Sequence, residues 1–169
     1  MSFALWLTGL SGSGKSAIAG ELLERLHARG VDAARLESDV LRTQLTPFAR
    51  YDEAERDFFY AAVSALGSLV VRYGRAVVFD ATANRRRYRD AARLAIARFA
   101  EVYVDTPLEV CAARDPKGLY RQAKASALPG LQAPYEPPLV PELVVHGARG
   151  TPAEAAEKIL AFLGRRGWI

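Results

Sequence analysis

The chain has 169 residues, of which 50% are hydrophobic and 25% charged, and this composition predicts one domain over residues 1–169 with a buried core. The net charge of +4 favours anionic partners, a class that includes nucleotides, nucleic acids and membrane surfaces. A single cysteine, Cys111, excludes an internal disulfide, and the sequence holds neither a signal-peptide pattern nor an apolar run of bilayer length, so we expect a cytoplasmic protein without a membrane partner.

Short apolar runs alternate with helical patterns along the chain. The first run, residues 3–9, ends in glycine and is followed by a helical pattern from residue 15. This alternation predicts the α/β class, with a mostly parallel sheet covered by helices on both faces. We expect strands at about 3–9, 33–38, 75–81, 100–107 and 141–147, and helices at about 15–29, 53–73, 86–99, from 108 and from 151.

Three of the predicted helices have apolar residues that we expect in the core. The alanines and Leu94 give the basic helix at 86–99 a buried face, and Cys111 lies on the apolar face of the helix from residue 108. In the helix at 53–73 the residues that recur at helical spacing are Phe58, Phe59, Ala62, Val63, Leu66 and Val70.

Residues 9–16, "GLSGSGKS", match the phosphate-loop pattern at every fixed position. In such a loop consecutive backbone N–H groups face one anion, and the helix that follows adds its positive end. The lysine reaches the β- and γ-phosphates, and the final hydroxyl is a magnesium ligand. The loop therefore predicts binding of ATP or GTP by Gly9, Ser11, Gly12, Ser13, Gly14, Lys15 and Ser16.

Two aspartates follow predicted strands, Asp39 in "LESDVLR" and Asp80 in "VVFDAT". Phosphoryl transfer to a hydroxyl benefits from one carboxylate that orients the acceptor and another that holds magnesium. Asp39 suits the first role. Asp80 could bind magnesium with Ser16 or act as the base, and both aspartates could instead be helix caps or turn residues. The predicted catalytic residues are Lys15, Asp39 and Asp80.

A basic run, "NRRRYRDAAR", follows Asp80 and raises the question of nucleic-acid binding. The same residues form the amphipathic helix at 86–99, so a solvated basic surface is the commoner explanation, and nucleic acid is not expected as a partner. Tyr51 lies between Arg42 and Arg56, where it could stack on a base or be partly buried against a helix.

Three segments together resemble the adenylylsulfate kinases: "FALWLTGLSGSGKSAIAGEL", "EVYVDTPLEVCAARDPKGLYRQAKA" and "PYEPPLVPELVV". Enzymes of this family phosphorylate the 3′-hydroxyl of adenosine 5′-phosphosulfate with ATP and magnesium. The resemblance implies a three-layer P-loop kinase fold, similar to nucleoside kinases, with a lid and closing segment at about 114–138. It also implies a nucleotide as the small-molecule substrate and a homodimer as the assembly.

The resemblance also assigns roles to residues outside the phosphate loop. Arg114 resembles the lid arginine that contacts the nucleotide, and Asp115 its partner. Asp39 resembles the aspartate beside the acceptor hydroxyl. The remaining substrate residues it implies are Lys117 at the anionic substrate, Arg42 and Arg56 around the phosphosulfate, and Tyr51 and Leu128 at the two adenine-stacking positions, where the family has phenylalanine.

The sequence departs from the family pattern on the acceptor side. Glu37 and Ser38 replace the first two residues of an Asp-Gly-Asp motif, and residues 59–62 replace an Asn-x-Arg-Arg run. Leu128 replaces the second stacking phenylalanine, and "DATAN" replaces Ser-Phe-Ile-Ser-Pro and supplies Asp80. Lost polar contacts of this kind change specificity.

Three hypotheses follow from these matches and departures. The leading one is an adenylylsulfate kinase, and the second is a kinase of the same family that acts on another nucleotide-linked or small hydroxylated acceptor. The third is a nucleotide-binding module without catalysis, or a nucleic-acid-binding protein. The retained kinase residues, which include the phosphate loop and Asp39, favour the first two.

Overall fold

A parallel sheet forms the centre of the computed structural model, which describes residues 2–121, 128–131 and 133–169. In these residues the sheet has five strands in the order β2-β3-β1-β4-β5, and every pairing is parallel, as the sequence predicts. The strands are β1 (Ala4–Thr8), β2 (Ala33–Glu37), β3 (Ala76–Asp80), β4 (Phe99–Asp105) and β5 (Leu143–His146).

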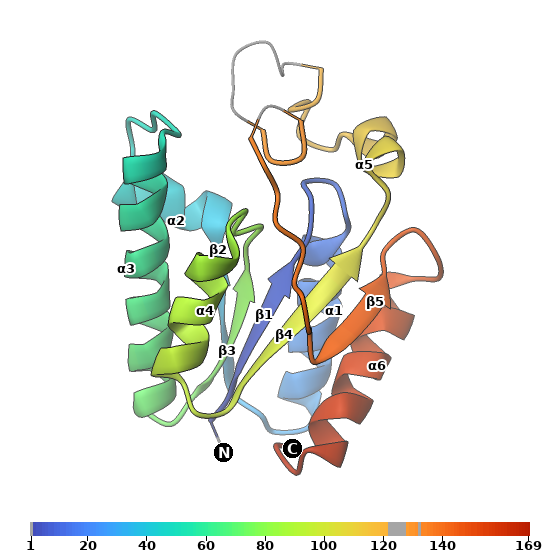
Figure 1. The fold of residues 1–169 in the computed structure, drawn as a ribbon. Helices are drawn as coiled ribbons and strands as arrows, with labels where there is room; N and C mark the ends of the chain where they lie inside the picture. The colour runs from blue at the N-terminus through green and yellow to red at the C-terminus, as the bar shows by residue number, and fades with distance from the viewer. Residues whose placement is uncertain (1, 122–127, 132) are drawn as a thin grey trace.

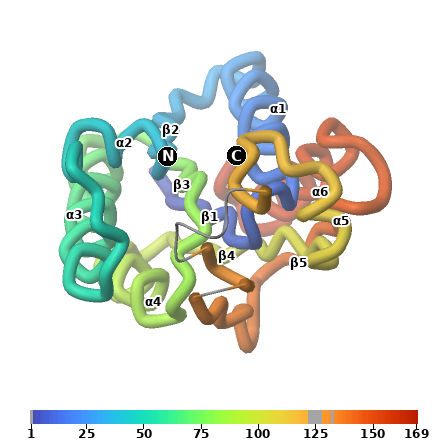
Figure 2. The backbone as a smooth tube through the Cα atoms, turned by 90° about the horizontal axis from the view of Figure 1, so that it is seen from above, coloured from blue at the N-terminus to red at the C-terminus, as the bar shows by residue number. Residues whose placement is uncertain are grey.

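Helices cover both faces of this sheet (Figure 1). Seen from above, the strands run between a group that contains α3 and α4 and a group that contains α1 and α6 (Figure 2). The predicted three-layer architecture is therefore confirmed. The helices are α1 (Lys15–Ala28), α2 (Ser38–Leu45), α3 (Glu53–Arg72), α4 (Arg86–Ala95), α5 (Leu108–Arg114) and α6 (Pro152–Arg165).

The central strand β1 shows why its sequence is apolar from Ala4 to Leu7. Leu5 and Leu7 belong to the core cluster that includes residues of α1 and α6. Ala4 and Trp6 belong to the cluster on the other face, with residues of α3 and α4. Because successive side chains of a strand point to opposite faces, a strand covered on both sides has no exposed face to carry polar residues.

Several apolar residues expected in the core are exposed instead, including Ala91 and Ala95 of α4. Leu94 is 90% exposed, because α4 buries Tyr88, Arg89 and Ala92, and Leu94 follows Ala92 by two positions, more than half a turn away. Phe58 is 60% exposed and Leu66 is at 36%. The buried stripe of α3 runs through Phe59, Tyr60, Val63, Ser64 and Gly67.

The arginines of the basic run form ion pairs within the fold. Arg89 is 1% exposed, and its guanidinium contacts the Glu101 carboxylate and the backbone carbonyls of Ala83 and Glu136. Arg93 donates to Glu142 at 2.9 Å, and Arg87 pairs with Asp57. These guanidinium groups therefore connect α4 to neighbouring segments.

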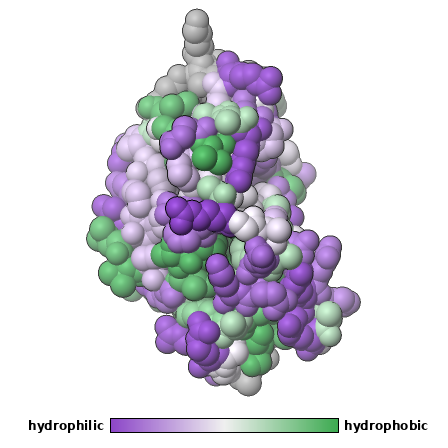
Figure 3. All heavy atoms as spheres, turned by 90° about the vertical axis from the view of Figure 1, so that its right-hand side faces the viewer, coloured by the Kyte–Doolittle hydropathy of each residue, from purple (hydrophilic) through white to green (hydrophobic). Residues whose placement is uncertain are grey.

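No helix in the part of the chain that the structure describes is long and apolar enough to span a bilayer. On the face shown in Figure 3, hydrophobic residues lie in separate patches among hydrophilic ones. Cys111 is fully buried, which confirms its predicted place in the core.

One contact between α3 and β3 leads to a stability prediction. A Cβ atom at Gly67 would lie 2.0 Å from Cζ of Phe79, whose ring is fully buried and stacks on Trp6 with centroids 4.4 Å apart. Overpacking of this kind costs about 1–3 kcal/mol, more than the gain of about 1 kcal/mol in helix propensity. We therefore expect Gly67→Ala to lower the free energy of unfolding in urea.

Gly20→Ala is the matched control. Gly20 lies inside α1, and nothing lies within 4 Å of its Cβ position. There the helix-propensity gain is unopposed, and we expect stabilisation by about 0.5–1 kcal/mol. Equal stability of the two variants would contradict the packing argument.

Candidate active site

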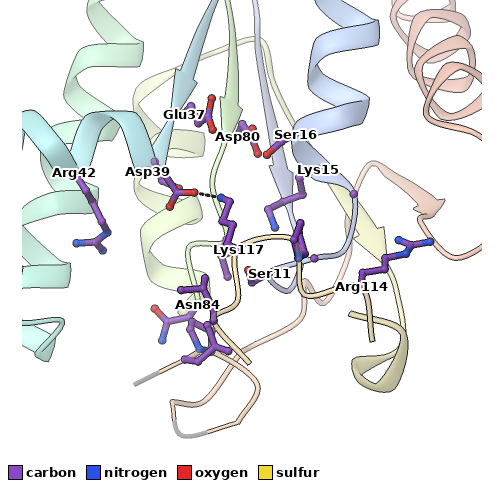
Figure 4. Close-up of a pocket in the computed structure, with 18 of the residues that line it drawn as sticks. Ser11, Lys15, Ser16, Glu37, Asp39, Arg42, Asp80, Asn84, Arg114 and Lys117 are labelled. Carbon is purple, nitrogen blue, oxygen red and sulfur yellow. Dashed lines mark hydrogen bonds and ion pairs between the residues drawn. The ribbon is translucent and has the colours of Figure 1, made fainter. Parts of the chain in front are cut away.

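A cavity of about 810 Å³ opens at the carboxyl ends of β1, β2 and β3. In open parallel sheets ligands bind at this edge, and both chain termini lie at the opposite end of the molecule (Figure 1). Most of the predicted site residues line this one cavity (Figure 4). They are Ser11, Gly12, Gly14, Lys15, Ser16, Asp39, Arg42, Tyr51, Arg56, Asp80, Arg114, Lys117 and Leu128.

The phosphate loop connects β1 to α1 and is packed tightly against α5. A Cβ atom at Gly12 would lie 2.8 Å from the carbonyl oxygen of Cys111, so only glycine fits there. Gly9 and Ser13 do not line the cavity. The Ser13 side chain is buried, and its backbone carbonyl accepts a hydrogen bond from Thr106 at 2.9 Å. Gly9 and Ser13 therefore support the conformation of the loop away from the cavity.

The ammonium group of Lys15 is folded into the loop itself. Its Nζ donates to the carbonyls of Gly9 at 2.9 Å and Leu10 at 2.8 Å, and lies 3.4 Å from Oγ of Ser13. Burial disfavours the charged form and lowers the pKa of Lys15 to about 8, while the nearby Asp80 carboxylate acts in the opposite direction. An anion at the mouth of the loop would therefore stabilise the charged form of Lys15.

Asp80 ends β3 with a side chain that is only 2% exposed. Its Oδ2 accepts a hydrogen bond of 2.6 Å from Arg35, a residue of β2 that the sequence did not single out. Glu37 is the cross-strand partner of Asp80, and both line the cavity with Ser16 from the first turn of α1 (Figure 4). A carboxylate pair beside a hydroxyl group is a set of hard oxygen donors, which fits magnesium.

The described residues contain no cluster of three or more acidic, histidine or cysteine side chains that could enclose a metal alone. Magnesium in kinases is held by one or two carboxylates, with substrate phosphates and water completing its shell. The donor set at Ser16 and Asp80 therefore fits a metal that arrives with a nucleotide.

Asp39 lies in the first turn of α2, a helix that the sequence analysis missed. Its carboxylate forms an ion pair with Lys117 from the segment after α5, drawn as a dashed line in Figure 4. The two side chains are 55% and 47% exposed. The structure thus joins two residues that are 78 positions apart in the sequence and that the resemblance places at the substrate.

Arg42 is held by aromatic rings and by a carboxylate. Its Nη1 donates to Oε1 of Glu55 at 3.0 Å, and its guanidinium carbon lies 4.0 Å from the centroid of Phe59 and 5.0 Å from that of Tyr51. Such stacking fixes a guanidinium plane. Tyr51 is 42% exposed, and Arg56, on α3, is 8% exposed. Both line the cavity together with Arg42.

The first part of the predicted lid touches the phosphate loop. Tyr120 donates from its hydroxyl to the carbonyl of Ser11 at 2.7 Å, and burial raises the pKa of this phenol to about 12, which keeps the proton on the donor. Asp115 accepts from the N–H group of Tyr120 at 3.0 Å. Arg114 donates to the carbonyl of Gly147 at 2.8 Å, beside β5.

Residues 122–127 and 132 of the predicted lid lie outside the described residues. Leu128 follows the first gap, is 6% exposed and lines the cavity. Leu128 therefore lies on the cavity wall, and the resemblance expects an aromatic ring at its position.

The end of the predicted lid is fixed to the body of the protein. Glu136 accepts from the backbone N–H of Arg86 at 2.8 Å and from Nη1 of Arg85 at 3.0 Å, and its own N–H donates to the carbonyl of Asn84 at 2.8 Å. Tyr135 hydrogen-bonds Thr8 at the end of β1, with 3.1 Å between the oxygens. Sequence reasoning missed these contacts, because nothing in the local pattern links residues 127 positions apart.

Known proteins resemble this chain over most of its length. The sequence pattern of the family described as adenylylsulphate kinase matches residues 1–146. An adenylyl-sulfate kinase of Rippkaea orientalis is 37% identical over 168 residues, which cover 98% of this chain and 93% of that protein. A bifunctional enzyme CysN/CysC of Xylella fastidiosa is 40% identical, over 96% of this chain and 27% of that protein.

Solved structures agree with these sequence matches. Mycobacterium tuberculosis APS kinase CysC, in complex with AMPPNP and APS, superimposes with a TM-score of 0.90 at 33% identity, over 96% of this chain and 98% of that one. A sugar kinase from Janibacter shares the fold alone, with a TM-score of 0.67 at 19% identity over 97% and 95% of the two chains. The predicted P-loop kinase fold is thus confirmed, and the chain belongs to the adenylylsulphate kinase family.

Proposed function

We propose that this chain transfers the γ-phosphoryl group of ATP to the 3′-hydroxyl of adenosine 5′-phosphosulfate. The observation that carries the proposal is that Lys15 and Ser16 of the phosphate loop line the same cavity as the Asp39–Lys117 ion pair. Family membership supplies the substrate class, because the solved relative from Mycobacterium tuberculosis contains AMPPNP and APS in its complex.

The nucleotide side of the reaction is assigned to the loop and to Arg114. Backbone N–H groups of the loop hold the phosphates, and Lys15 turns from its carbonyl partners toward the transferring group, where its charge is needed. Magnesium would be held by Ser16 and Asp80, and there it supplies charge neutralisation at the phosphates. Arg114, at the edge of the cavity, adds a second positive charge for the nucleotide.

The acceptor side is assigned to the opposite wall. Asp39 accepts the hydrogen bond of the 3′-hydroxyl and orients it, while Lys117 neutralises the carboxylate until substrate binds. Arg42 and Arg56 contact the phosphosulfate, and Tyr51 and Leu128 border the adenine. The aromatic contacts of Arg42 hold its guanidinium ready, so little rotamer entropy is lost on binding.

One observation favours a second candidate, a kinase of this family with a different acceptor. Phe59 and Tyr60 stand where the family pattern has a polar run, and both are buried, at 0% and 6% exposure. Arg42 already has a partner in Glu55. An acceptor that carries less negative charge than a phosphosulfate would fit this wall without breaking that ion pair.

We also assign the domain, the lid and the assembly of the chain. Residues 1–169 form one kinase domain in the cytoplasm, and residues 114–138 act as the lid, anchored at Glu136 and closing over the nucleotide from Arg114 onward. Two copies of the chain pair as a homodimer. A relative from Thiobacillus denitrificans is described as a hexameric APS kinase, which supports assembly of some order within the family.

The acceptor role of Asp39 can be tested directly. We expect Asp39→Asn to lower kcat for phosphoadenylylsulfate formation by roughly 10²–10⁴-fold, because a positioned general base contributes that much, and to leave ATP affinity little changed. Steady-state kinetics with adenosine 5′-phosphosulfate, together with calorimetric titration of an ATP analogue, measures both quantities.

Asp32→Asn is the matched control, since Asp32 pairs with Arg75 at 2.7 Å at the other end of the strands, and it should keep the wild-type rate. A wild-type rate no higher than that of Lys15→Ala would refute the proposed activity. A panel of other hydroxylated acceptors, assayed for ATP consumption, decides between the two candidates: a much faster rate with another acceptor would favour the second.

The lowered pKa of Lys15 predicts proton uptake on nucleotide binding. Bound phosphates stabilise the ammonium form and raise its pKa above about 8. Affinity should therefore be constant well below pH 8 and fall as the pH rises through that value. At pH 8.5, calorimetry in buffers of different ionisation enthalpy should show uptake of roughly half a proton or more per nucleotide.

Lys15→Arg remains charged at this pH and should show no such uptake, whatever its affinity. The same proton count for both proteins would assign the uptake to another group and contradict this explanation.

A further inference from the structure

A cationic side chain lies among the groups that the proposed function assigns to magnesium. Arg35, on β2, places its Nη2 atom 2.6 Å from Oδ2 of Asp80 and 3.3 Å from Oε2 of Glu37. The same nitrogen lies 3.4 Å from the backbone carbonyl of Ser16. One guanidinium nitrogen thus contacts both carboxylates, and also the residue whose hydroxyl completes the donor set.

The sheet register explains how Arg35 reaches this position. β2 pairs with β3 so that Arg35 lies opposite Val78 and Glu37 lies opposite Asp80. Val78 belongs to the core cluster that packs on α1, so the alternation of side chains puts Arg35, Glu37 and Asp80 on the α1 face as well. Arg35 is therefore directed between the edge of the sheet and the start of α1, toward Ser16.

The position of Arg35 leaves one of its buried donors without a partner in the described part of the chain, which indicates that its positive charge is needed there. The Nε atom of Arg35 is buried and has no hydrogen-bond partner among the described residues. An unsatisfied buried donor destabilises a fold unless another interaction of the same side chain compensates for it. The compensating interaction here is the contact with Asp80, whose carboxylate is 2% exposed and needs a countercharge.

Lys15 is the other cation near Asp80, but its ammonium group donates to carbonyls of the phosphate loop. The hydrogen bond of 2.6 Å to Asp80 comes from Arg35. Arg35 therefore supplies the countercharge of Asp80, a role that a metal ion would also fill.

We propose that Arg35 is a positioning residue that competes with magnesium for the carboxylate of Asp80. The inference rests on the proposed function, because that function brings the metal with ATP. Two cations cannot share one buried carboxylate without repulsion, so binding of the magnesium nucleotide displaces Arg35 from Asp80. The Arg35 side chain is 29% exposed and lies on the edge strand, which leaves it solvent to move into.

The competition predicts a change in metal dependence, which a merely structural ion pair would not produce. The experiment titrates a non-hydrolysable ATP analogue by calorimetry, first in EDTA and then over a range of magnesium concentrations. For Arg35→Leu we expect the half-saturating magnesium concentration to fall roughly tenfold, equivalent to about 1.4 kcal/mol. In EDTA the variant should bind the analogue more weakly than wild type, because the uncompensated Asp80 repels the phosphates.

Arg75→Leu is the matched control. Arg75 pairs with Asp32 at 2.7 Å at the opposite end of β2 and β3, and both side chains are more than half exposed. This variant should keep the wild-type metal dependence. Arg35→Lys keeps the charge but loses the fork of donors, and we expect it to fall between wild type and Arg35→Leu.

A folded Arg35→Leu protein with unchanged metal dependence would overturn the inference. If that variant does not fold, a crystal structure of the wild-type protein with the magnesium nucleotide decides: Arg35 away from Asp80 supports the competition, and an intact hydrogen bond between them overturns it. The binding experiment needs no acceptor. Intact metal-linked binding without turnover of adenosine 5′-phosphosulfate would therefore contradict the proposed function alone.

Discussion

The buried carboxylate of Asp80 is the constraint on which the rest of the site depends. It ends a strand that has neighbours on both sides, so water reaches it poorly, and a charge in that place requires partners. Arg35 approaches it from the edge strand, and Lys15 lies close enough for its pKa to respond. The carboxylate of Asp80 thus interacts both with Lys15 of the phosphate loop and with Arg35 of β2.

A second, buried ion pair holds the end of the proposed lid segment to the body of the protein. Arg89 and Glu101 form a buried pair, and the same guanidinium contacts the backbone of Glu136. Removing either charge would leave the other one buried and unpaired, which is far more costly than losing an exposed pair. The end of the proposed lid, which contains Tyr135, is therefore anchored to α4 and β1, and we expect the closing movement in the lid residues that precede it.

Much of the fold could be predicted from local patterns, because its causes are local. The apolar run of β1 and the fixed positions of the phosphate loop identified a parallel sheet and its nucleotide edge. Helix α2 was missed because it has only eight residues, and among the described residues its contact with the core is limited to Leu41 and Leu45, which are too few to stand out as a periodic pattern. Leu94 was misplaced because a face of a short helix is set by the partner it packs on, which periodicity does not identify. Arg35 was overlooked because two of its partners, Asp80 and Ser16, come from other elements.

Three of the departures from the family pattern, Glu37, Asp80 and Phe59, fall into two groups in space. Glu37 and Asp80 are cross-strand neighbours that share one arginine, so they amount to a single change on the proposed metal side. Phe59 packs under Arg42 on the proposed acceptor side. Between the two groups stands Asp39 with its lysine partner, which matches the family. A change on the metal side alters how the nucleotide is held for any acceptor, whereas a change under Arg42 alters which acceptor is held. The two groups therefore act on separable steps of one transfer reaction.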